Sequence, residues 1–144
     1  FNTGSRIVVG WISDKIGRIR TITYVLVLMV LSLLAIYLSG LNGNTFLFRA
    51  GICLLGFSYG SFMGIYPALT SDPSGVKYSA LNYGMLFIGF SLAGVVGPLI
   101  MQKIFSEFAS YRPSFPIAIV FALIGIALTF LYRAVNRKLA QKSA

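Results

Sequence analysis

Gly10-Trp-Ile-Ser-Asp-Lys-Ile-Gly-Arg-Ile-Arg20 is a short charged turn between two strongly apolar stretches of the chain. Nowhere else do as many charges as those of Asp14, Lys15, Arg18 and Arg20 stand in so few residues. The apolar residues on both sides indicate that the turn connects two segments buried in a nonpolar medium.

Composition identifies that medium as a bilayer. Of 144 residues, 57% are hydrophobic and 10% charged, with a mean hydropathy of +0.84, whereas soluble domains carry about 25% charged residues. The net charge of +9 would also suit a nucleic-acid-binding protein. We favour basic residues held on one side of a membrane, because the charges stand between apolar spans and form no soluble basic face.

Residues with catalytic or metal-binding side chains are scarce. The chain has no His, and its single cysteine, Cys53, lies in an apolar run. An internal disulfide is therefore excluded, and no metal or other cofactor is expected. An integral-membrane enzyme would need clustered carboxylates, His or an activated nucleophile. The sequence offers no such cluster, so we expect no enzymatic activity.

Four stretches approach the roughly 20 mostly apolar residues that a spanning helix needs. They are residues 22–39, 46–70, 82–102 and 115–132, and residues 1–13 look like the end of a further span whose beginning is missing. Helix is expected rather than strand, because the runs are long and do not alternate. The fold class is therefore an all-α membrane protein.

The distribution of basic residues predicts the orientation. One side of the spans carries Lys15, Arg18, Arg20, Lys77, Arg133, Arg137, Lys138 and Lys142. That side should face the cytoplasm of a multi-pass plasma (inner) membrane protein, with the tail 133–144 also cytoplasmic. Such a basic tail can touch anionic lipid, although it usually serves only as a topology anchor.

Small residues predict close helix contacts in two spans. Gly56, Gly60 and Gly64 share one helix face, where they allow another backbone to approach closely. Aromatic and sulfur-containing side chains occupy a different face, which suits either a cavity wall or plain packing; they are Tyr59, Phe62, Met63 and Tyr66.

The span 82–102 has a matching stripe. Its aromatic part contains Tyr83, Phe87 and Phe90, and its outer part contains Gly94, Gly97 and Pro98. Pro98 removes one backbone donor and should kink the helix. The stripe fits a helix that bends during gating, and it equally fits a static tight crossing.

The pattern G-x-x-x-D-[RK]-x-G-R-x-[RK], complete at positions 10–20, resembles the cytoplasmic loop signature of the major facilitator superfamily. Tyr66-Pro-Ala-Leu-Thr-Ser-Asp72, Asn82-Tyr-Gly-Met-Leu-Phe87 and Gly94-Val-Val-Gly-Pro98 resemble helices ten and eleven of the oxalate/formate antiporter family. The resemblance implies the C-terminal part of a bundle of about twelve helices, from the end of helix eight through helix twelve. It implies a missing N-terminal half as partner.

The resemblance gives the charged turn a gating role. Asp14 could meet the positive end of a neighbouring helix, Arg18 and Arg20 could pair with acids, and Gly10 and Gly17 permit close approach and a tight bend. With Lys15, the set would act as a latch for one access state. Alternatively, these charges only fix the topology.

Arg6 is the predicted substrate residue. It lies about 12 Å along the helix from Asp14, inside the hydrocarbon region, where a guanidinium marks a pathway or a ligand. Its planar fork matches a carboxylate. The alternatives are snorkelling to the interface, or pairing with an acid in the missing half. Tyr59, Phe87 and Phe90 are the predicted cavity walls.

The chain departs from the family at one position. Oxalate-transporting members carry a lysine in helix eleven, but residues 82–102 contain no basic residue, and Phe90 stands near its expected place. A single Arg fits a monocarboxylate better than oxalate. With no acid inside the spans, exchange or uniport is expected unless the missing half supplies a proton relay. The predicted function is secondary transport of a small organic anion by alternating access; the alternative is a small multi-span scaffold without transport activity.

Overall fold

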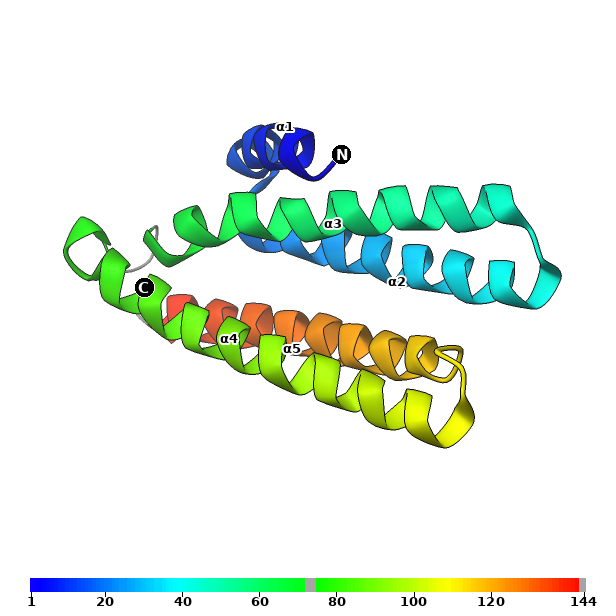
Figure 1. The fold of residues 1–144 in the computed structure, drawn as a ribbon. Coiled ribbons are helices and arrows are strands. Elements are labelled where there is room, and N and C mark those ends of the chain that lie inside the picture. Colours follow the sequence, from blue (N-terminus) through cyan, green and yellow to red (C-terminus); the bar gives the residue numbers. More distant parts are fainter. Residues whose placement is uncertain (72–74, 143–144) are drawn as a thin grey trace.

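The protein is built from helices that run nearly its whole length (Figure 1). The computed structural model describes the backbone of residues 1–71 and 75–142 and the side chains of residues 1–70 and 78–135. The helices of this part are α1 (Asn2–Ile16), α2 (Arg18–Asn42), α3 (Thr45–Ser71), α4 (Gly75–Phe108) and α5 (Ser114–Lys142). Because α2 through α5 each contain a stretch long and apolar enough to cross a membrane, the predicted all-α membrane fold is confirmed.

Glycine and asparagine set the short connections between the first three helices. Gly17 has φ 100° and ψ 139°, which breaks the helix between α1 and α2. Gly43 ends α2 in the left-handed conformation at φ 66°, the usual place for glycine after a helix. The Asn44 side-chain oxygen then accepts hydrogen bonds from the backbone N–H groups of Phe46 and Leu47, at 3.0 and 3.2 Å. This cap satisfies two donors at the start of α3.

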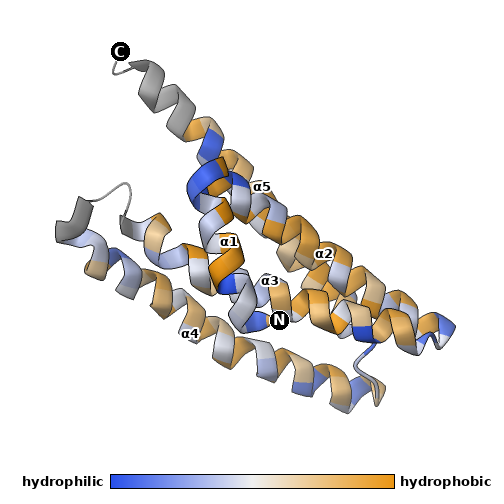
Figure 2. Cartoon of the chain, turned by 90° about the horizontal axis from the view of Figure 1, so that it is seen from above, coloured by the Kyte–Doolittle hydropathy of each residue, from blue (hydrophilic) through white to orange (hydrophobic). Residues whose placement is uncertain are grey.

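The helices pack around the pair α2 and α3, which lie side by side in Figure 1. The short α1 crosses over α3, α5 packs on α2, and α4 packs on α3. Although a short loop joins α4 to α5, the two helices spread apart when the molecule is seen from above (Figure 2). The membrane-spanning helices therefore form two hairpins that touch mainly through α2.

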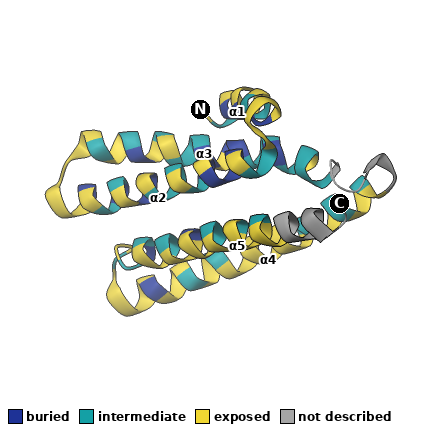
Figure 3. Cartoon of the chain, turned by 180° about the vertical axis from the view of Figure 1, so that it is seen from behind, coloured by how far each residue is buried: buried dark blue, intermediate teal, exposed yellow. Residues whose placement is uncertain are grey.

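Burial is concentrated where α1, α2 and α3 meet (Figure 3). The core there contains Val9, Ile22, Val25 and Ile65. By contrast, the most apolar window of α4 has 0% of its residues buried, against 39% for α2. The apolar side chains of α4 thus remain available to lipid or to further helices.

The helices extend beyond the predicted spans where polar residues at their ends also adopt helical conformation. The helix α2 continues past the predicted span 22–39 through Asn42, so that only Gly43 and Asn44 separate it from α3. The helix α4 extends beyond 82–102 at both ends, and α5 continues as far as Lys142. The side chains of Lys77 and of the predicted tail beyond Val135, and the whole of Asp72, lie outside the described residues.

Candidate functional site

Two glycines of α3 allow the backbone of residues 2–6 in α1 to approach this helix closely. A Cβ at Gly64 would lie 2.7 Å from the Arg6 carbonyl oxygen and 3.0 Å from its Cα, and a Cβ at Gly60 would overlap the Asn2 carbonyl and the Ser5 hydroxyl. Gly64 lies six residues inside the end of the span Thr45–Thr70, about 9 Å at 1.5 Å per residue. The backbone of Arg6 therefore packs against α3 less than two turns inside the end of this candidate span, and its depth in the membrane stays a prediction.

The Arg6 guanidinium has an uncharged partner. Its Nε and Nη2 atoms donate to the Asn2 side-chain oxygen at 3.3 and 3.1 Å. Among the described residues no carboxylate pairs with Arg6, and the side chain is exposed. Because a guanidinium carries five N–H donors, donors remain for an anion. Asn2 was not predicted for the site, although its spacing of four residues from Arg6 places both on one face of α1.

The three predicted wall residues come together between α3 and α4. The ring centroids of Tyr59 and Phe90 lie 6.4 Å apart, and those of Phe87 and Phe90 lie 5.7 Å apart. Tyr83 extends the row, with its ring 4.6 Å from that of Phe87. These distances suit tilted aromatic pairs. The row forms one side of the α3–α4 interface, and its ring contacts do not include the Arg6 side chain.

The charged turn folds onto itself. Arg18 and Asp14 form a salt bridge of 2.5 Å across the break at Gly17, and Arg18 also donates to the Ser13 hydroxyl at 3.2 Å. The Lys15 ammonium lies over the Trp11 ring, 3.8 Å from its centroid. Asp14 was expected to meet the positive end of a neighbouring helix; here the described partner of its carboxylate is Arg18, which stands in the first turn of α2. The bridge joins the end of α1 to the start of α2.

The remaining glycines of the prediction have open surroundings. A Cβ at Gly10, Gly56, Gly94 or Gly97 would meet no described atom within 4 Å. Pro98 lies inside α4, which continues past it. The tight packing assigned to Gly94 and Gly97 therefore stays a prediction. A close contact that the sequence reasoning missed is Gly51, whose Cβ would lie 2.6 Å from the Ile36 side chain.

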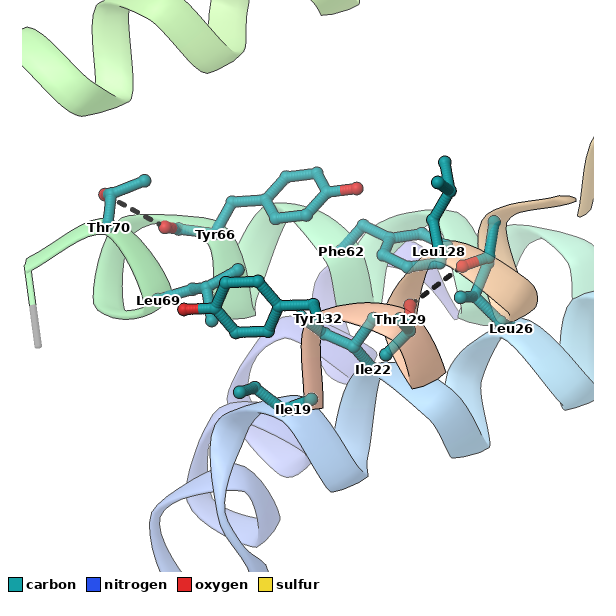
Figure 4. A pocket seen from close by; sticks show the side chains of 11 residues that line it. Ile19, Ile22, Leu26, Phe62, Tyr66, Leu69, Thr70, Leu128, Thr129 and Tyr132 are labelled. Atoms are coloured by element: carbon teal, nitrogen blue, oxygen red, sulfur yellow. Dashed lines mark hydrogen bonds between the residues drawn. The ribbon is translucent and has the colours of Figure 1, made fainter. Parts of the chain in front are cut away.

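A separate apolar pocket of about 460 Å³ lies between α2, α3 and α5 (Figure 4). Phe62 and Tyr66 of α3 stack at 5.6 Å and line it, together with Tyr132 of α5. The aromatic face predicted for α3 is thus divided, since Tyr59 pairs with α4 instead. The Thr70 and Thr129 hydroxyls in this pocket donate to the carbonyls of their own helices. With no cation in its lining, this pocket suits hydrocarbon better than an anion.

Metal chemistry has no visible basis in the part of the chain that the structure describes. No group of three or more His, Cys, Asp or Glu side chains there could hold a metal ion. Cys53 is a free cysteine. The candidate binding residues are therefore Arg6 with its partner Asn2 and, separately, the aromatic row between α3 and α4.

Comparisons with known proteins find membrane transporters that are similar to this chain. The family model described as Major Facilitator Superfamily matches residues 2–144. An uncharacterized MFS-type transporter of Escherichia coli strain K12, YhjX, is 35% identical over 94 residues, which cover 65% of this chain and 23% of that protein. The oxalate:formate antiporter of Oxalobacter formigenes is 30% identical over 138 residues, which cover 95% of this chain and 32% of that protein. The chain thus spans about a quarter to a third of the length of these curated relatives. No solved structure matches it.

Proposed function

Because this chain belongs to the Major Facilitator Superfamily, we propose that it forms part of a secondary transporter for a small organic anion of the monocarboxylate type. The observation that carries the proposal is Arg6, whose backbone packs against Gly64 in the candidate span of α3 and whose guanidinium has an uncharged amide as its described partner. A cation in that environment favours an anionic ligand. The carboxylate of the substrate would bind the free edge of the guanidinium.

The single cation limits the substrate. The oxalate:formate antiporter, a relative at 30% identity, exchanges a dicarboxylate for a monocarboxylate by its name. Here residues 82–102 of α4 contain no basic residue, and Phe90 pairs with Tyr59 at the expected place of the family's lysine. One guanidinium neutralises one carboxylate. Formate or lactate therefore fits this site better than oxalate, with Tyr59, Phe87 and Phe90 as the apolar wall.

Exchange by alternating access is the mechanism that the charges support. The chain has three acidic residues, Asp14, Asp72 and Glu107, and all three stand at or beyond the ends of the predicted spans, where a carboxylate is poorly placed for a proton relay across the membrane. The Asp14–Arg18 bridge would hold the cytoplasmic ends of α1 and α2 together in one access state. We place this end and the C-terminal tail in the cytoplasm, because the basic residues gather there.

Substitution of Arg6 tests the proposal. In proteoliposomes loaded with unlabelled formate or lactate, Arg6→Gln should lower counterflow of the labelled anion at least 100-fold, since a charge-assisted bidentate contact is lost. Arg6→Lys should retain part of the activity, because it keeps the charge without the fork. Arg49→Gln, at the exposed start of α3, is the matched control and should exchange normally.

Two results would count against this function. Unchanged counterflow in Arg6→Gln would remove Arg6 from the substrate site. Absence of exchange for every small anion tested, in a protein that inserts normally, would favour the alternative of a multi-span scaffold or assembly protein.

A further inference from the structure

A second cavity lies at the charged end of the molecule, away from Arg6. It measures about 340 Å³ between the start of α2 and the late turns of α5, and its lining consists of Ile16, Arg20, Thr23, Tyr24, Phe130 and Arg133. Arg20 is the third residue of the span Arg18–Asn42, and Arg133 is the third from the end of the span Ser114–Val135. Both guanidiniums therefore stand at one bilayer face. Figure 2 shows the hydrophilic α1–α2 turn beside α5 at this end.

Neither of these two arginines is paired with a carboxylate of the described residues. Among the described residues neither has a hydrogen-bond or salt-bridge partner that would occupy its guanidinium. The chain contains only three acids: Asp14 pairs with Arg18, Glu107 lies at the opposite end of α4, and Asp72 is outside the described residues. Two like charges lining one cavity repel each other unless an anion lies between them. The cavity is therefore complementary to an anion.

The donors in the cavity fit a phosphate group. Each guanidinium presents a planar fork that can donate two hydrogen bonds to neighbouring phosphate oxygens, and the Tyr24 phenol can add one more. The Thr23 hydroxyl already donates to the Ile19 carbonyl at 2.9 Å. The donors come from two different helices, so a phosphate bound here would bridge α2 and α5.

Apolar stripes lead from the cavity toward the membrane interior. On α2 the steps of four, three and four residues from Arg20 reach Tyr24, Val27 and Leu31, which are all exposed. On α5 the residues that precede Arg133 on the same side of the helix include Phe130 and Leu123, which are exposed as well. A free phosphate ion would not contact this apolar surface. A phospholipid would cover it with its acyl chains while its headgroup filled the cavity.

We propose that Arg20 and Arg133 bind the phosphate of an anionic phospholipid, with its acyl chains along α2 and α5. Basic pockets between spanning helices on the cytoplasmic side are suited to anionic headgroups. In this proposal Arg20 does not belong to the predicted gating latch. It binds lipid instead, and the bound lipid connects α2 to α5. Lipid binding here does not depend on which substrate is transported.

Lipid titration of the purified protein tests this site without measuring transport. Native mass spectrometry in detergent would count bound phosphatidylglycerol and, separately, bound phosphatidylcholine. Each cation near the surface contributes about fivefold to binding of an anionic lipid, so the wild type should prefer phosphatidylglycerol by roughly 25-fold. The Arg20→Gln/Arg133→Gln variant should lose this preference. Arg20→Lys/Arg133→Lys should keep most of it, because the charges remain.

Arg49→Gln provides the matched control, since it removes one charge at the other end of the spans and should leave the preference unchanged. If the double Gln variant does not fold, the single variants carry the test, each with a loss of about fivefold. A double variant that keeps the wild-type preference would overturn the proposal. Binding of free glycerol 1-phosphate as tight as that of phosphatidylglycerol would also overturn it, because the acyl chains would then contribute nothing.

Discussion

At the scale of single residues, Gly17 is a position where the backbone conformation restricts which residue can be accommodated. Its φ of 100° and ψ of 139° are rarely adopted by residues with a Cβ, and holding one there costs about 1–3 kcal/mol. Gly17→Ala should therefore lower the free energy of unfolding in mixed micelles by about that amount. The Asp14–Arg18 bridge should loosen with it, because both partners flank this residue.

Gly10→Ala is the control for Gly17, because it changes the same residue type within the same turn. Gly10 is helical, and its added Cβ would meet no described atom within 4 Å. The variant should be neutral or more stable by up to about 1 kcal/mol, since alanine favours helix. Equal destabilisation by both substitutions would mean that the positive φ of Gly17 is not what the fold requires.

At the scale of helices, the crossing of α1 over α3 depends on the absence of a side chain at Gly64. A Cβ there would lie 2.7 Å from the Arg6 carbonyl oxygen, which is backbone and cannot rotate away. Gly64→Ala should therefore push α1 from α3, lower stability by about 1–3 kcal/mol, and displace Arg6. Unfolding in mixed micelles, with anion counterflow as a second readout, would measure both effects.

The matched control for this crossing is Gly56→Ala, two helical turns away on the same face of α3. A Cβ at Gly56 would meet no described atom, so this variant should gain the helix propensity of alanine, about 1 kcal/mol. If Gly56→Ala is as destabilising as Gly64→Ala, the face as a whole is sensitive and the contact with Arg6 is not the reason.

The sequence predicted the helices well because apolar runs are a local property, whereas their ends and contacts are not. Gly40 stays inside α2 and Lys103 and Glu107 stay inside α4, since polar residues near an interface can remain helical after the apolar run has ended. The i,i+4 pair of Asn2 and Arg6 could have been found from spacing alone. The cavity shared by Arg20 and Arg133 could not, because it exists only when α5 packs on α2.

At the scale of the whole molecule, α2 is the element through which the two hairpins are mainly joined. At its charged end it shares a cavity with α5, and at its other end Arg112, in the α4–α5 loop, donates from Nη2 to the Gly40 carbonyl oxygen at 2.7 Å. The last carbonyls of a helix lack intrahelical partners and carry partial negative charge. Arg112 therefore caps α2 with a charge-assisted bond across 72 positions of sequence.

Removal of this cap should separate the hairpins at one end only. Because the bond is exposed and screened by salt, Arg112→Gln should lower stability by no more than about 1 kcal/mol, but it should raise amide hydrogen exchange at the start of α5. The difference from wild type should shrink in high salt, while Arg49→Gln should leave exchange at the start of α5 unchanged. If exchange there is the same in Arg112→Gln and wild type at low salt, the packing of α5 on α2 and of α4 on α3 holds the hairpins together, and the Arg112 bond makes no measurable contribution.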